Sequence, residues 1–228
     1  MRAVVLKVIG LFLLIGYSGD YESERTKSGL MLSEYRGNKT ELSVPKRYST
    51  VRHEAFKNAS YLTSISLNEN IKNIETATFL YCEKLSAINV SPKNEYYSSL
   101  DGVLFNKEQT ILLQYPMNKR GAAYIVPDTV REIGEQAFRG NNFLETLIIN
   151  ETLETLDSGA FFDCSGLKEV YVNKDRPPFL YGASVFGDQH PERIIYVKKG
   201  TLEYYLENPY WAGYKDSIRE ALSNAEDY

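Results

Sequence analysis

The sequence predicts a right-handed solenoid of stacked units, each about 23 residues long and built from a β-strand, a turn and a short helix. The first observation is a fixed spacing, because Phe56 and Phe79 are 23 residues apart, as are Phe138 and Phe161. The second is a leucine that follows each of these aromatic residues in the same register. The third is a short run of alternating apolar residues downstream, typical of a strand with one buried face. Units this short cannot bury their apolar faces alone, so neighbouring units are expected to share one core.

The first residues differ in composition from the rest of the chain. Arg2 precedes an apolar run over residues 3–15 that is broken only by Lys7, and small or polar residues follow. This order predicts a signal peptide over residues 1–19. The run is shorter than the roughly 20 apolar residues of a spanning helix, so no stable membrane span is expected in the mature chain. The alternative interpretation is a buried first strand or helix.

Residues 20–40 are polar and predict a linker that leads into an incomplete first repeat. The repeat domain is expected over residues 41–228. Its alternating runs predict parallel strands that form one continuous sheet. These runs are Leu42–Val44, Ile65–Leu67, Ile88–Val90, Tyr124–Val126, Leu147–Ile149, Val170–Val172 and Ile195–Val197.

The regular spacing is interrupted between Phe79 and Phe138, which are 59 residues apart. This gap predicts a β-hairpin insertion at about residues 94–122, with a turn at Asp101-Gly102 and apolar strands at Val103–Phe105 and Thr110–Leu113.

A helix and an aromatic turn are expected to close the open end of the stack, over about residues 198–228. This segment contains Tyr204, Tyr205, Tyr210, Trp211 and Tyr214. Most of these rings are expected to form the cap's own core, and one or two could extend a binding surface.

Composition and residue types exclude several function classes. The net charge of −4 and the absence of a basic cluster argue against a nucleic-acid partner. Cys82 and Cys164 occupy the same position of separate repeats, which predicts two free, buried thiols. The two histidines, His53 and His190, lie in an early and a late repeat, and no G-x-S-x-G motif is present. We therefore expect no catalytic residues, no metal site, no cofactor and no enzymatic activity, with His53 as a turn or surface residue.

The exposed face of the predicted sheet carries the candidate binding site. The middle residue of each alternating run should point to solvent. In the early runs these residues are Ser43, Ser66 and Asn89, whereas in the later runs they are Ile125, Ile148, Tyr171 and Tyr196. An apolar patch with polar surroundings commonly marks an interaction site, so these four later residues are predicted to bind a ligand. Two alternatives are cross-strand pairing that only stabilises the sheet, and coverage by the hairpin insertion.

Several motifs together resemble the BspA-like class of leucine-rich repeat proteins over about residues 40–215. They are the Ile-Gly-x-x-Ala-Phe start of the repeat at Ile133, the Ala160-Phe161-x-x-Cys164 repeat, the insert Asp101–Asn106 and the ending Val197-x-Lys199-Gly200. The sequence departs from the pattern at Asn141, where cysteine is usual. The resemblance implies a leucine-rich repeat solenoid of the kind found in exported or surface proteins of bacteria, several of which are linked to adhesion.

The expected function is that of a non-catalytic, exported protein, secreted or at the cell surface. It would bind a protein partner, such as a host matrix or cell-surface protein, and adhesion is one expected role. A carbohydrate receptor is the main alternative, because tyrosine and tryptophan rings also suit glycans. A structural subunit of a cell-envelope assembly is the third.

Overall fold

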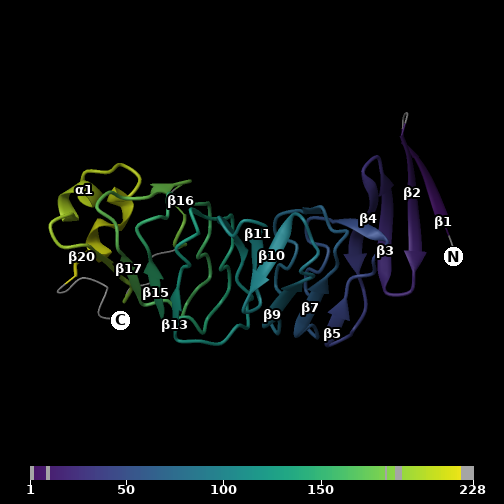
Figure 1. The fold of residues 1–228 in the computed structure, drawn as a ribbon, viewed down its shortest axis with the longest axis horizontal. Coiled ribbons are helices and arrows are strands. Elements are labelled where there is room, and N and C mark those ends of the chain that lie inside the picture. Colours follow the sequence, from purple (N-terminus) through teal and green to yellow (C-terminus); the bar gives the residue numbers. More distant parts are fainter. Residues whose placement is uncertain (1–2, 9–10, 183, 188–191, 222–228) are drawn as a thin grey trace. The chain divides into compact units, whose positions relative to one another are not determined.

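The computed structural model describes residues 3–8, 11–182, 184–187 and 192–221 (Figure 1). The chain divides into two compact units, Met1–Lys107 and Glu108–Tyr228. Each unit is a β-solenoid in which parallel strands from successive repeats stack in register.

The first unit contains a sheet with antiparallel strands at its start and parallel strands after them. Its order is β1 (Ala3–Val8), β2 (Leu11–Ser18), β3 (Tyr21–Thr26), β4 (Gly29–Tyr35), β6 (Tyr48–Val51) and β8 (Asn73–Ile74). Strands β3 and β4 lie where the sequence predicted a linker over residues 20–40, so that expectation is wrong. The physical reason is that β4 contributes apolar side chains to the core: Met31, Leu32 and Tyr35 are buried, and β4 pairs in parallel with β6.

A second sheet of the first unit contains β5 (Glu41–Ser43), β7 (Ser64–Leu67) and β9 (Ala87–Val90), all parallel. A hairpin follows, in which β10 (Tyr97–Leu100) pairs antiparallel with β11 (Val103–Asn106) around the turn at Asp101-Gly102. Strand β11 contains the first of the two predicted apolar runs, Val103–Phe105.

The hairpin also explains why the seven predicted strands do not form one sheet. Beyond β9, the Ile88 amide donates to the Gly102 carbonyl at 2.8 Å, and the Val90 amide donates to Ser99 Oγ at 2.9 Å. The turn therefore takes the position of the next strand. Gly102 has a φ of +76°, and a Cβ there would lie 2.9 Å from the Ala87 Cβ, so the close approach requires glycine.

The second unit has two sheets of parallel strands. The first has the order β12 (Ile111–Gln114), β14 (Glu132–Ile133), β16 (Thr155–Leu156) and β18 (Phe179–Leu180). The second has the order β13 (Ala123–Ile125), β15 (Thr146–Ile149), β17 (Glu169–Val172), β19 (Ile194–Val197) and β20 (Ile218–Glu220). Within this unit, β13, β15 and β17 lie side by side in Figure 1.

Stacked aromatic rings run through the core of each unit. In the first unit, Phe56 and Phe79 stack with ring centroids 5.6 Å apart. In the second unit the column contains Tyr115, Phe138, Phe161 and Phe186, with neighbouring centroids 4.7, 4.9 and 5.3 Å apart. The repeating phenylalanine of the sequence therefore forms a continuous column of rings within each unit.

The aromatic residues after Gly200 close the column of the second unit. Trp211 and Tyr205 are fully buried, and Tyr214 meets Phe186 edge to face with centroids 5.2 Å apart. Tyr205 lies in helix α1 (Leu202–Leu206) and Tyr214 in the 3-10 helix η1 (Ala212–Ser217), and Trp211 directly precedes η1.

Turns replace the short helices that the sequence predicted within the repeats. Among the described residues, helices occur only in the segment 202–217. The segment around each core phenylalanine contains residues with positive φ, such as Glu54 (57°) and Asn58 (60°) in one repeat and Gln136 (55°) and Gly140 (74°) in another. In these repeats two residues four positions apart have a left-handed backbone conformation, and this prevents a right-handed helix from forming between them.

Candidate functional site

The predicted ligand-binding residues form one row across the second sheet of the second unit. Ile125 of β13 pairs with Ile148 of β15, Ile148 with Tyr171 of β17, and Tyr171 with Tyr196 of β19. Aligned residues of adjacent strands are about 4.8 Å apart and point to the same face. We call these four residues the sheet-face row.

Exposure changes along the sheet-face row. Ile125 is 58% exposed, Ile148 and Tyr196 are half-buried, and Tyr171 is only 8% exposed. The expectation that all four middle residues are solvent-exposed is therefore wrong for Tyr171. The physical reason is lateral packing, because the Tyr171 ring stacks on Tyr196 with centroids 4.8 Å apart.

The residues that border the sheet-face row include apolar, polar and charged side chains. On the same face, the preceding aligned residues are Ala123, Thr146, Glu169 and Ile194. The Tyr171 hydroxyl donates to the Glu169 carboxylate at 3.3 Å, which orients its ring. The next strand adds Arg219, aligned with Tyr196. The row therefore presents an apolar strip beside charged and hydrogen-bonding groups.

The equivalent face of the first unit has a different character. Its middle residues Ser43, Ser66 and Asn89 are exposed and aligned in the same way across β5, β7 and β9. The change from polar to apolar middle residues, predicted from sequence, is thus a difference between the two units.

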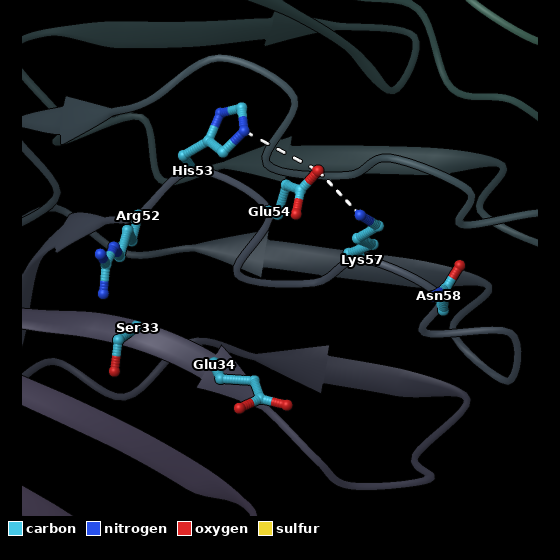
Figure 2. A pocket seen from close by; sticks show the side chains of 7 residues that line it. All are labelled: Ser33, Glu34, Arg52, His53, Glu54, Lys57 and Asn58. Carbon is cyan, nitrogen blue, oxygen red and sulfur yellow. Dashed lines mark hydrogen bonds and ion pairs between the residues drawn. The ribbon is translucent and has the colours of Figure 1, made fainter.

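A second candidate is an open cavity of about 440 Å³ in the first unit (Figure 2). Residues of β4 and of the turn after β6 line it: Ser33, Glu34, Arg52, His53, Glu54, Lys57 and Asn58. This cavity was not predicted from the sequence, because its lining residues come from the segment that was expected to be a linker and from one repeat turn.

The charged side chains at this cavity mainly neutralise one another. Glu54 lies 2.9 Å from Lys57 and 3.8 Å from His53, as Figure 2 shows. Hydrogen bonding to Lys57 lowers the pKa of Glu54. Arg52 pairs with Glu24 at 2.6 Å. Opposite charges at this cavity are therefore paired with one another. His53 is the surface residue that the sequence predicted, because 53% of its side chain is exposed.

The cysteines are free and buried, as the sequence predicted. The thiol of Cys82 donates to the Phe56 carbonyl, and that of Cys164 to the Phe138 carbonyl, each at 3.0 Å. Burial raises the pKa of both thiols to about 12. They are therefore protonated, unreactive core groups. His190 lies outside the described residues.

Three exposed rings of the second unit form a cluster that was not predicted. Phe179 meets Tyr181 and Tyr210 edge to face, with centroids 4.9 Å apart in each case. Their exposures are 43%, 56% and 48%, respectively. Tyr210 belongs to the predicted cap, where Tyr205, Trp211 and Tyr214 are core residues. Phe179 and Tyr181 carry no repeat signature in the sequence, although an aromatic pair beside two prolines could have drawn attention to them.

The described part of the chain lacks two further features. No group of three or more His, Cys, Asp and Glu side chains there could hold a metal ion. No helix among those residues is long and apolar enough to cross a membrane.

Comparisons with known proteins agree with the repeat architecture. The family model for the BspA type leucine rich repeat region matches residues 34–112 and 118–181 of this chain, with six copies of the repeat. A search of curated proteins gives no match.

Similar solved structures include a leucine-rich repeat protein from Eubacterium ventriosum, with 14% identity and a TM-score of 0.48 over 90% of this chain and 83% of the other. A leucine rich cell surface protein from Faecalibacterium prausnitzii has 12% identity and a TM-score of 0.44 over 92% and 96%. The pneumococcal vaccine antigen PcpA has 17% identity and a TM-score of 0.45 over 79% and 66%.

Proposed function

This chain belongs to the family with BspA-type leucine-rich repeats, and from that premise we propose that it is an exported, non-catalytic protein that binds another protein through the sheet-face row. Repeat solenoids of this kind generally serve protein interaction and are generally not enzymes. The observation that carries the proposal is the in-register alignment of four large apolar residues on an outward face whose counterpart in the first unit is polar.

The energetics support binding at this face. Ile125 leaves more than half of its side chain in water, and Ile148 and Tyr196 are half-buried. Covering such a strip gains about 25 cal/mol for each Å² of apolar surface removed from water. The Tyr171–Tyr196 stack adds a rigid aromatic platform, and rigid rings lose little entropy on binding.

The test is a binding screen of the folded protein against host matrix and bacterial surface proteins, with variants at the exposed positions. Ile125→Asp and Tyr196→Ala should each weaken a protein interaction at least about tenfold, which corresponds to about 1.4 kcal/mol. Tyr171 is a poor probe, because it is buried and its truncation would also lower stability.

The matched control is Ser66→Asp, which places the same charge at the equivalent middle position of β7 in the first unit. It should leave binding unchanged. A partner that binds the Ile125→Asp variant as tightly as the parent protein would contradict the assignment of the site.

A carbohydrate receptor remains a second candidate, since the exposed rings of Phe179, Tyr181 and Tyr210 could stack on sugars. A glycan array probed with the same variants separates the two functions. A glycan hit that the sheet-face variants leave intact would favour the receptor.

A further inference from the structure

The exposed aromatic cluster of Phe179, Tyr181 and Tyr210 is held in place by backbone bonds. The amide of Phe179 donates to the Glu154 carbonyl, and that of Tyr181 to the Leu156 carbonyl, at 2.8 and 2.9 Å. The indole of buried Trp211 donates to the Pro178 carbonyl at 2.8 Å, which fixes the neighbouring Tyr210 against β18. The rings are thus preorganised although each is about half exposed.

Carboxylates flank this cluster on the same sheet face. Glu132 of β14 aligns with Thr155 of β16, and Thr155 aligns with Phe179 of β18. Asp157 directly follows β16 and Tyr181 directly follows β18, and the Tyr181 amide donates to the Leu156 carbonyl, so the two residues lie side by side just beyond these strands. Alternate residues share a face, so acids and rings lie on one surface.

Several carboxylates of the second unit pair with a lysine or arginine. Glu154 pairs with Arg131, Asp163 with Arg139, and Asp175 with Lys198. In the described part of the chain, neither Glu132 nor Asp157 has a lysine or arginine within salt-bridge distance. Burial, and then the nearby Asp157 carboxylate, raise the pKa of Glu132.

We propose that the aromatic cluster, together with Glu132 and Asp157, binds a lysine or arginine side chain from a basic segment of a protein partner. A cation gains from both parts of this surface: the carboxylates attract its charge, and the ring faces attract it through their quadrupoles at distances up to about 6 Å. The chain already shows such a contact nearby in sequence, with the Arg176 guanidinium carbon 3.7 Å from the Tyr204 ring centroid. A neutral sugar would donate hydroxyl hydrogen bonds to these carboxylates but would not neutralise their charge, whereas a cation does both.

This site is separate from the sheet-face row, since β14, β16 and β18 belong to the other sheet of the second unit. The proposal therefore does not depend on the function proposed above. It adds a second contact surface with a chemistry of its own, acidic and aromatic.

The test measures binding of a fluorescent oligo-arginine peptide of about ten residues by anisotropy, because arginine combines charge with ring stacking. Two double variants divide the site: Tyr181→Ala/Tyr210→Ala removes exposed rings, and Glu132→Gln/Asp157→Asn removes charge at constant shape. Each should weaken binding about tenfold or more.

Matched controls separate the site from general acidity. Tyr61→Ala removes a 58% exposed ring from the first unit, and Glu145→Gln removes an exposed carboxylate from the second. Both should bind the peptide like the parent protein. Equal weakening by Glu145→Gln and by the Glu132→Gln/Asp157→Asn variant would overturn the proposal, because binding would then follow net charge alone.

The variant that lacks two exposed rings provides the second test of the proposal. If the Tyr181→Ala/Tyr210→Ala protein, shown to be folded by circular dichroism, binds the peptide unchanged, the rings have no part in the site and the proposal fails. Loss of a glycan interaction in this variant without any peptide binding by the parent protein would also overturn it, in favour of a sugar platform.

Discussion

Several buried polar side chains bond to backbone carbonyl groups of neighbouring repeats. Asn141 is fully buried, and its amide donates to the carbonyls of Pro116 and Lys119 at 3.0 Å each. Its oxygen accepts from the amides of Phe143 and Leu144. In other repeats the same position is Cys82 or Cys164, whose thiol donates to a carbonyl. Asparagine and cysteine are both small and both donate to a carbonyl from this position, which explains why asparagine can stand where cysteine is usual.

Replacing Asn141 by alanine should lower the free energy of unfolding by about 3 kcal/mol, because buried carbonyl and amide groups would lose their partners. Urea denaturation followed by circular dichroism measures the change. The adjacent Asn142→Ala is the control, since Asn142 is exposed and water can replace its bond to the Ser165 amide. Similar losses for the two variants would contradict the argument.

The buried thiols make a second prediction at the scale of single residues. Since burial raises the pKa of Cys82 and Cys164 to about 12, neither is a thiolate at neutral pH. A thiol reagent should react with neither in the folded protein and with both after denaturation. Rapid modification of either cysteine under native conditions would show that its repeat opens readily.

At the scale of elements, the sequence pattern predicted which residues of each strand face the core, and the structure confirms it for most of them, although Val90 and Tyr124 are only half-buried. Ile65, Leu147 and Val170 are buried, as their alternation requires. The pattern could not predict the burial of Tyr171, because that depends on the side chains beside it on adjacent strands. It also could not predict the aromatic cluster, because β18 is a two-residue strand and its partner ring comes from the cap.

The column of rings gives a prediction for the repeat as an element. Phe138 is fully buried between Tyr115 and Phe161, so Phe138→Ala should cost about 3–5 kcal/mol of stability. Phe143→Ala in the same repeat is the control, because that ring is 38% exposed. Thermal unfolding should separate the two variants clearly, and a small effect at Phe138 would mean that the column is not the core.

Strand β14 gives a prediction of pH dependence. Burial and Asp157 raise the pKa of Glu132, so the folded state holds this proton to higher pH than the unfolded state does. The free energy of unfolding should therefore fall as pH rises from the ordinary glutamate range through the raised pKa. The Glu132→Gln variant should lack this pH dependence of the free energy of unfolding. It should be more stable than the parent protein at neutral pH and equally stable near pH 3, where Glu132 is protonated in both the folded and the unfolded state. An equal effect at both pH values would point to a lost contact instead of a charge effect.

At the scale of the whole molecule, the repeat period predicted stacked units because it constrains every repeat at once. The interruptions of the stack follow no period, and their structures depend on contacts that one sequence does not reveal. Thus the hairpin ends one sheet at β9, through bonds from Ile88 and Val90 to the segment 99–102. Likewise, the polar segment 20–40 contains the strands β3 and β4, because β4 pairs with β6.

The proposed export of the chain makes the last prediction. If residues 1–19 are a signal peptide, a chain that begins at Asp20 must contain a complete domain. Among the residues whose burial the structure describes, Leu32, Tyr35 and Tyr48 are core residues of the first unit that lie beyond that point, and β3 retains its pairing with β4. The shortened chain should therefore fold with a Tm within about 4 °C of the full chain, which corresponds to about 1 kcal/mol.

N-terminal sequencing of the protein recovered outside a bacterial host gives the complementary measurement and should place the first residue near Asp20. In the structure β2 pairs with β3, so loss of residues 1–19 could instead unfold the domain, and that outcome would also be informative. If removing residues 1–19 unfolds the domain, strands β1 and β2 are integral to the first sheet. The alternative of a buried first strand would then replace the signal peptide, and export would need another route.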